Sequence, residues 1–210
     1  MDKIFKYSLF PDLEQEDQFL AAFSHCTIVY NELINLQSEY YGQNNKLLSF
    51  RDCVNQVYKI RGQREDLRYA DGSALLMTIG DLLDDIRRSQ KAGEGYPLFK
   101  PRSRMAFKLS NVAGDIEYHR RAIYLPKYGW VAISAVEPEI EGYIKNVLIY
   151  YRDDAYYISI LCSDTPFTNR KKNKSKDQPS STEKDTSDEE AVQDNVICGW
   201  VVDPNYYSEG

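Results

Sequence analysis

Hydrophobic and polar positions alternate over the first ten residues and then change to a helical period. Residues 3–10, KIFKYSLF, have the alternation of a short strand, which Pro11 ends because proline cannot donate to a sheet ladder. Asp12 and Gln15 have the spacing of a capping box, so a helix is predicted to begin here. Its hydrophobic stripe, which we assign to the core, consists of Phe19, Phe23, Cys26, Tyr30, Leu33, Leu36 and Tyr40.

Two shorter amphipathic helices follow a polar break. The first is predicted to begin at Ser49 and to end at Gly62, because glycine favours the conformation that terminates a helix. The second is predicted to begin near Asp71 or Ser73. Three amphipathic helices of this length can bury one another's hydrophobic stripes as a small bundle.

After Gly93 the chain changes to short segments rich in β-branched and aromatic residues. They read MAFKLSN, AIYLPKYGWVAIS, YIKNVLIYY and AYYISIL, and the last two are joined by RDDA, which predicts a hairpin. The predicted fold class is α+β, with a small antiparallel β-barrel, OB-like in size, interrupted after its first strand by the helices. Residues 1–11 and 99–162 would form the barrel and residues 12–98 the helical insertion.

The last quarter of the chain has a different composition. Residues 163–195 contain a block of cations and then a block of anions, with too little hydrophobic surface to offset the ordering entropy, so we predict a disordered linker. Residues 196–210, VICGWVVDPNYYSEG, begin as a strand-like hydrophobic run and reach a turn signal at Asp203.

The formal net charge of −6 conceals a basic middle third. Between Asp12 and Gln90 eight lysines and arginines face thirteen acidic residues, whereas between Lys91 and Ile133 eight face only three. The acidic total argues against a histone-like, sequence-blind binder of nucleic acid. It leaves room for a local anion-binding surface.

The loop GEGYPLFKPRSRMAF, residues 93–107, gathers cations, rings and prolines. Cations facing phosphates supply nucleic-acid affinity, and aromatic rings add stacking on unpaired bases. The candidate phosphate contacts are Lys100, Arg102, Arg104, Lys108, Arg120, Arg121 and Lys127. The candidate stacking rings are Tyr96, Phe99 and Trp130. The alternative is a solvated charged face with Tyr96 and Phe99 plugging the barrel against the helices; we prefer it for these two rings, but prefer phosphate contact for the cations.

The sequence contains no motif for a metal site, a catalytic nucleophile or a nucleotide-binding loop. The four cysteines are scattered without CxxC spacing, and His25 and His119 lack a second ligand at metal spacing. No nucleophile motif or glycine-rich phosphate loop is present, so no cofactor and no metal are expected. No hydrophobic run approaches the roughly 20 residues of a membrane span, and the N-terminus lacks a signal-peptide core, which predicts a soluble, cytoplasmic protein.

Several of these segments, in this order, resemble the N-terminal half of the transposon-encoded TnpB proteins, RNA-guided nucleases related to compact type V CRISPR effectors. The resemblance covers residues 3–162. It rests on KYSLFPDLEQEDQFLAAFSHCTIVYNELINLQSEYY, on SALLMTIGDLLDDIRRSQKAGEGYPLFKPRSRMAFKLSN, and on IYLPKYGWVAI and EGYIKNVLIYYRDDAYYISI. The most specific piece is GYPLFK, Gly95 to Lys100.

The resemblance implies a wedge-type barrel interrupted by a helical recognition lobe, which together hold a guide RNA and read duplex DNA. In the family a RuvC-like nuclease domain follows, usually with a zinc ribbon. Such a nuclease needs several carboxylates from different strands to hold two metal ions about 4 Å apart. Here only Asp203 stands in a candidate position, as a remnant of the first RuvC-like strand, and a plain turn residue is the preferred interpretation of it. We therefore expect no enzymatic activity.

Three functional hypotheses follow. The first is a nuclease-deficient TnpB-like protein that binds guide RNA, and through it duplex DNA, without cleavage. The second is an interaction subunit that pairs through Val196–Asp203 with a separately encoded nuclease half or a related effector, because an unpaired hydrophobic strand favours β-augmentation. The third is a decayed transposon gene product.

Overall fold

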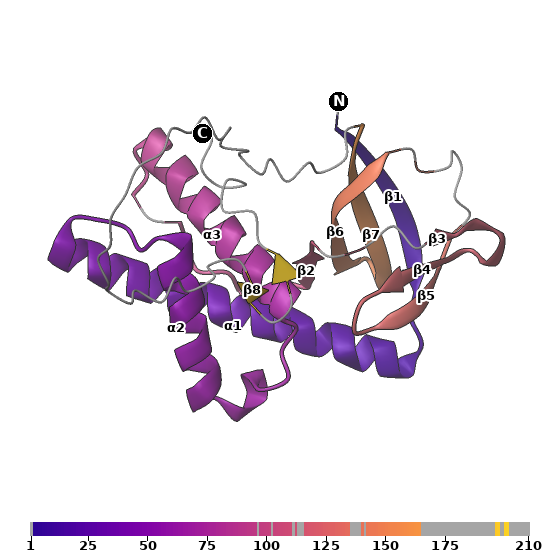
Figure 1. Cartoon of the computed structure of the whole chain (residues 1–210), viewed down its shortest axis with the longest axis horizontal. Coiled ribbons are helices and arrows are strands. Elements are labelled where there is room, and N and C mark those ends of the chain that lie inside the picture. The colour runs from indigo at the N-terminus through magenta and orange to yellow at the C-terminus, as the bar shows by residue number, and fades with distance from the viewer. Residues whose placement is uncertain are drawn as a thin grey trace, which may run out of the picture. The chain divides into compact units, whose positions relative to one another are not determined.

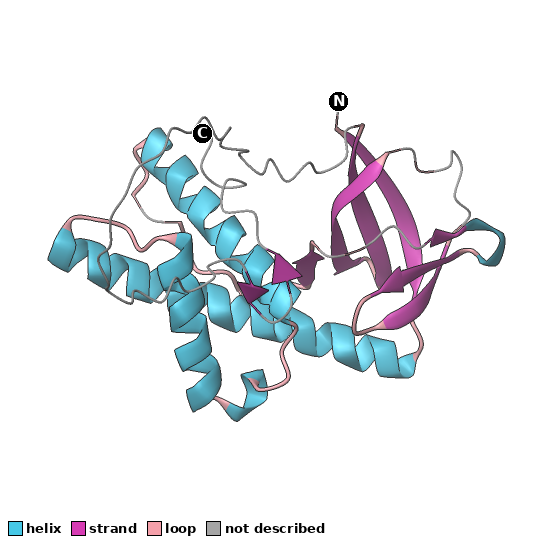
Figure 2. Ribbon diagram, viewed as in Figure 1, coloured by secondary structure: helices cyan, strands magenta, loops and turns pink. Residues whose placement is uncertain are grey.

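The structure is a computed structural model, and it describes most of the first 164 residues. The described residues are 2–95, 97–101, 103–110, 112, 116–134, 140, 142–164, 196–197 and 200–201. Residues up to Pro166 belong to one compact unit, built from three helices and a seven-stranded sheet (Figures 1 and 2). None of the described helices is long and hydrophobic enough to cross a bilayer.

The chain begins with strand β1, Lys3–Phe10, and continues into the long helix α1, Leu13–Asn44. The predicted capping box is confirmed: the Asp12 carboxylate accepts from the Gln15 amide at 2.9 Å, and the Gln15 side chain accepts from the Asp12 amide at 3.1 Å. The helix ends at Asn45, whose left-handed φ of 51° stops the helical path.

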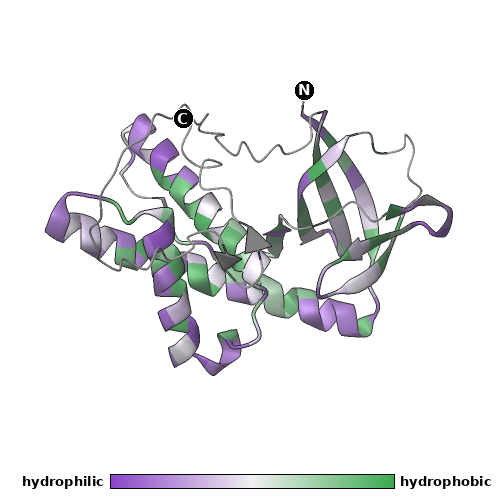
Figure 3. Cartoon of the chain, in the orientation of Figure 1, coloured by the Kyte–Doolittle hydropathy of each residue, from purple (hydrophilic) through white to green (hydrophobic). Residues whose placement is uncertain are grey.

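Two shorter helices pack beside the C-terminal half of α1. Helix α2, Phe50–Gln63, begins with a capping box at Ser49, and helix α3, Gly72–Ala92, is capped by Asp71. A short 3₁₀ turn, η1, Glu65–Leu67, links them. The fully buried Gln37 of α1 ties down the connection to α2, because its amide exchanges two hydrogen bonds with the backbone of Leu48 at 2.9 and 3.1 Å. Figure 3 shows hydrophobic and hydrophilic positions alternating along each helix, as an amphipathic stripe requires.

The sheet has the strand order β2-β6-β7-β1-β5-β4-β3, and every pairing is antiparallel. The further strands are β2 Ala106–Leu109, β3 Ile116–Glu117, β4 Ala122–Leu125, β5 Gly129–Ile133, β6 Tyr143–Arg152 and β7 Ala155–Ser163, with a 3₁₀ turn η2, Tyr118–Arg120, between β3 and β4. Strand β1 joins the two halves, since it pairs along Lys3–Leu9 with β7 and through its last two residues with β5.

The predicted closed barrel is wrong, because the sheet is open. Strands β2 and β3 lie on opposite edges, and no pairing joins them among the described residues. With four and two residues, these edge strands are too short to form a closing ladder. The sheet is nevertheless curved: Leu109 and Ile116 are seven residues apart and so at most about 25 Å from each other, whereas a flat seven-stranded sheet is about 29 Å wide.

The predicted hairpin at RDDA is confirmed. Arg152 pairs with Ala155, and the two residues between them, Asp153 and Asp154, have φ values of 51° and 57°. Two successive positive φ values define the turn whose twist matches that of the flanking strands, and aspartate tolerates this region better than most residues.

The core of the sheet meets α1 through an aromatic cluster. The ring centroid of Phe19 lies 5.2 Å from that of Tyr128, 5.8 Å from that of Phe107 and 5.9 Å from that of Tyr156. Phe23 adds a further contact to Phe107 at 5.6 Å. Tilted ring pairs at these separations are favourable beyond the area that they bury.

Outside this unit the structure describes one small hairpin. Strands β8, Val196–Ile197, and β9, Trp200–Val201, pair antiparallel. The predicted linker, residues 163–195, begins too early, because Ser163 is the last residue of β7. Asp203 and residues 165–195 lie outside the described residues.

Gln15 provides a test of how α1 is anchored to the sheet. Its amide donates to the carbonyl oxygens of Tyr128 at 3.0 Å and Trp130 at 2.9 Å, while its oxygen completes the capping box. Gln15→Glu keeps the capping acceptor but removes both donors and places a carboxylate against two carbonyl oxygens. We expect this variant to lose about 2 to 4 kcal/mol of unfolding free energy in urea denaturation, since each stranded carbonyl costs about 1–3 kcal/mol.

The control is Gln43→Glu, at an exposed position of the same helix whose side chain makes no hydrogen bond among the described residues. Glutamate is the usual partner in a capping box, so a stable Gln15→Glu protein would show that the contact with β5 contributes little.

Candidate nucleic-acid interface

The loop that follows α3 is fastened to α1 by its backbone. The Asn31 side chain donates to the Lys100 carbonyl and accepts from the Lys100 amide, both at 2.8 Å. An amide side chain that matches both backbone groups of one residue acts like a strand partner. The predicted basic loop is therefore held against the helices at Lys100.

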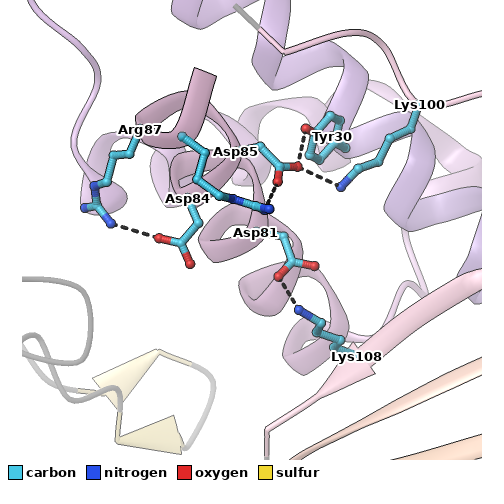
Figure 4. A network of polar contacts seen from close by, with 8 residues as sticks. Tyr30, Asp81, Asp84, Asp85, Arg87, Lys100 and Lys108 are labelled. Atoms are coloured by element: carbon cyan, nitrogen blue, oxygen red, sulfur yellow. Dashed lines mark hydrogen bonds and ion pairs between the residues drawn. The ribbon is translucent and has the colours of Figure 1, made fainter. Parts of the chain in front are cut away.

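Lys100 itself points inward. Its ammonium lies 3.4 Å from the Asp85 carboxylate and 3.3 Å from the centroid of the Tyr30 ring, and the Tyr30 hydroxyl donates to the same carboxylate at 2.6 Å (Figure 4). Only 15% of the Lys100 side chain is exposed. Burial, with the nearby charge of Arg104, lowers the pKa of the Lys100 ammonium to about 8. The Lys100 ammonium is therefore paired inside the protein with Asp85 and Tyr30.

Lys108 is engaged in a similar way. From strand β2 its ammonium bonds the Asp81 carboxylate of α3 at 2.5 Å. A third carboxylate of the helix, Asp84, bonds Arg87 on the same helix at 2.9 Å (Figure 4). Helix α3 therefore supplies carboxylates for two of the predicted phosphate contacts.

Arg104 lies between these pairs. It is half-buried and lines a small cavity of about 20 Å³ together with Cys26, Tyr30 and Asp81. Within the part of the chain that the structure describes, no hydrogen bond or ion pair engages its guanidinium. The thiol of Cys26 in the same cavity is inert, because burial raises its pKa to about 12.

The remaining predicted cations lie at the other end of the sheet. Arg120 in the turn η2 is 72% exposed and bonds Glu117 at 3.1 Å, and Arg121 is exposed at the start of β4, where its carbonyl accepts from Ile133 at 2.8 Å. Lys127, in the turn between β4 and β5, is exposed and donates to the Tyr69 carbonyl. The six predicted cations that the structure describes are thus divided between the loop with β2 and the segment around β4.

Two rings accompany this second group. Tyr124 and Trp130 face each other across β4 and β5, with centroids 5.5 Å apart in an edge-on contact, and are 38% and 46% exposed. On β1, Phe10 pairs in register with Ala132 and is also exposed, so the hydrophobic face extends to a third strand. We call Arg120, Arg121, Tyr124 and Trp130 the β4–β5 surface.

Tyr124 is a residue that the sequence analysis missed. The signal was available in the two-residue period of AIYL and GWVAI: Ile123 and Val131 are buried, so Tyr124 and Trp130 face the opposite side. An exposed ring at each of two paired positions is unusual enough to indicate a contact surface.

The other sequence predictions have mixed outcomes. Phe99 was expected to plug the interior, and this is wrong because 55% of it is exposed. Tyr96 and Arg102 lie outside the described residues.

His25 is half-buried, and burial lowers the pKa of its imidazole. Among the residues that the structure describes, no group of three or more histidine, cysteine or acidic side chains is placed to hold a metal ion.

Comparison with known proteins gives two matches. The family described as "Helix-turn-helix domain" (HTH_OrfB_IS605) matches residues 1–46. The chain is also 26% identical over 160 residues to the "Putative RNA-guided DNA endonuclease InsQ" of Escherichia coli (strain K12), an alignment that covers 74% of this chain and 39% of that protein. The chain thus spans well under half the length of this relative.

These matches agree with the predicted resemblance to the TnpB proteins. Residues 1–46 contain β1 and one uninterrupted helix, whereas a helix-turn-helix needs two helices. The matched segment is therefore a strand that leads into a single long helix.

Lys100 generates a prediction about pH. Its ammonium loses its proton near pH 8 in the folded protein but near pH 10.5 in the unfolded chain. Between these values the unfolded state binds more protons, so stability contributed by this group rises with pH. We expect the unfolding free energy of the wild type, minus that of Lys100→Met, to increase from pH 7.5 to pH 9.5 in urea denaturation. A constant or falling difference would show that burial does not lower this pKa.

Proposed function

We propose that this chain is a nucleic-acid-binding TnpB-like protein that binds a guide RNA, and through it target DNA, without cleaving either. One observation carries the proposal: exposed arginines immediately precede β4, and exposed aromatic rings lie on β4 and β5, in a chain related to a protein named as an RNA-guided endonuclease. The name of the matching family, a helix-turn-helix domain, supports nucleic acid as the class of ligand.

The chemistry of the β4–β5 surface supports RNA as a ligand. Arg121 has no hydrogen bond or ion pair through its side chain within the described residues, and Arg120 faces a single carboxylate at the surface, where such pairs are weak. Both guanidiniums are therefore available to phosphates, which arginine binds through two parallel hydrogen bonds. The rings of Tyr124 and Trp130 offer faces on which unpaired bases can stack.

The basic loop supports the proposal less directly. Lys100 and Lys108 are paired within the protein, so only Arg104 retains an unpaired guanidinium among the described cations of that loop. We assign the primary contacts to the β4–β5 surface for this reason. Lys127 lies at its margin and bridges to the connection between α2 and α3.

The absence of cleavage rests on the sequence. A two-metal nuclease needs carboxylates from several strands, and only Asp203 follows a hydrophobic run at the position implied by the resemblance. The interaction-subunit hypothesis stays a prediction, but its premise of an unpaired strand at Val196–Asp203 is not met, because Val196–Ile197 pairs with Trp200–Val201 in a hairpin.

The first test is RNA binding. We expect the protein purified from its native host at modest salt to carry a discrete RNA. The double variant Arg120→Glu/Arg121→Glu should lose at least about tenfold in affinity, because two phosphate contacts become repulsive. Trp130→Leu should lose about 5- to 100-fold, the range of one base stack, while Trp130→Phe keeps most of the affinity.

The control is Lys46→Glu/Lys91→Glu, which makes the same change in net charge at two exposed lysines of the helical part. Equal losses in this control and in the arginine variant would show that overall charge governs binding and that the β4–β5 surface is no specific site.

The second test is cleavage. The purified chain, loaded with its co-purified RNA, is incubated with labelled RNA and with single- and double-stranded DNA at millimolar Mg²⁺ or Mn²⁺. We expect every substrate to stay intact. Metal-dependent cleavage that survives in a repurified sample and is lost in Asp203→Asn would refute the non-cleaving half of the proposal.

A further inference from the structure

Helix α3 presents carboxylates to the basic loop on one side. Asp81 and Asp85 are four residues apart, about 6 Å along the helix axis, so they lie on the same face. One bonds Lys108 at 2.5 Å, and the other lies 3.4 Å from Lys100 (Figure 4). Two adjacent negative charges thus occupy the places where phosphates would meet these lysines.

Both pairs link segments far apart in the chain. Lys108 lies 27 residues from Asp81, and it reaches from the edge strand of the sheet to the helix. The side chains in these two pairs are between 15% and 32% exposed, so water screens them less than a surface pair. Asp84, between them in sequence, bonds Arg87 of its own helix instead.

The cations outnumber the carboxylates at this face. Lys100, Lys108 and the half-buried Arg104 lie beside Asp81 and Asp85, and Arg88 also bonds Asp85. Arg104 lowers the pKa of Lys100 through its charge, which shows that the surplus charge is felt within the cluster. A cluster with excess positive charge binds polyanions once its internal carboxylates are displaced.

We infer that Asp81 and Asp85 are internal counter-ions that close the segment Lys100–Lys108 to nucleic-acid phosphates. The phosphate backbone competes with these carboxylates, and only a ligand held elsewhere on the protein, or at high local concentration, displaces them. The two ion pairs therefore make phosphate binding at Lys100–Lys108 conditional on binding of the same nucleic acid elsewhere on the protein. This inference rests on the proposed function, since it concerns the regulation of nucleic-acid binding.

The test is the salt dependence of binding to a generic single-stranded oligonucleotide, measured on the full chain freed of co-purified RNA. Each new phosphate contact steepens the slope of log K against log salt by about 0.7 to 0.9. We expect Asp81→Asn, which releases Lys108, to steepen the slope by about that amount and to bind several-fold more tightly at low salt. Asp85→Asn, which releases both Lys100 and Arg88, should steepen the slope at least as much.

Asp84→Asn is the matched control, because it makes the same change in net charge on the same helix and frees only Arg87, which is 45% exposed and so already accessible to phosphates in the wild type. It should keep the wild-type slope. The double variant Asp81→Asn/Lys108→Met should return to the wild-type slope, because the released cation is gone. Thermal unfolding establishes that each variant is folded, and asparagine keeps the size of the side chain that it replaces.

The outcomes separate this inference from the proposed function. If the wild type binds and the Asp81 and Asp85 variants match Asp84→Asn, the internal counter-ions are refuted and the proposed function stands. If the wild type fails to bind the oligonucleotide and the Asp81 and Asp85 variants bind it, the counter-ion inference is supported. If no variant binds it, the counter-ion inference is refuted. In both cases the proposed function is decided separately, by whether a discrete RNA co-purifies with the wild type.

Discussion

The contact of Phe19 with the sheet is the interaction on which the rest of the structure depends. Helix α1 is 32 residues long, which is about 48 Å, and its two halves serve different partners. Near its N-terminus Phe19 contacts rings from β2, the β4–β5 turn and β7. Further along the helix, Tyr30 bonds α3 and Gln37 bonds the residue before the cap of α2. One rigid helix thus fixes the helices relative to the sheet, and the loop containing Lys100 spans between them.

This arrangement decides which charges are available to a ligand. Because α3 packs against α1 and against β2, its carboxylates meet the cations of the loop and of the edge strand. The N-terminal end of α1 packs beside β5 through Gln15, but among the described residues no carboxylate of α1 bonds Arg120 or Arg121. These arginines and the rings of Tyr124 and Trp130 are exposed. A basic segment in the sequence is therefore neutralised at one end of the fold and exposed at the other.

The sequence predicts the elements well because their signals are local. The capping boxes at Asp12 and Ser49, and the Asp153–Asp154 turn, depend on residues a few positions apart. The closed barrel was wrong because closure depends on the length and register of edge strands, and β3 is only two residues long. The basic surface was misassigned in part for a similar reason: whether Lys108 faces phosphate or Asp81 depends on a contact across 27 residues, which composition cannot reveal.

An acidic protein that binds nucleic acid must keep its cations from acting without discrimination. Mobile surface lysines would attract any polyanion, with an affinity set mainly by salt. Cations that are paired within the fold bind a phosphate only when the ligand gains more binding free energy than the internal ion pairs lose. Shape complementarity and base stacking at other sites then decide which ligand binds. Under the proposed function the net charge of −6 and the basic loop are compatible: the carboxylates of α3 would lower non-specific affinity, and the β4–β5 surface would supply the contacts that select a partner.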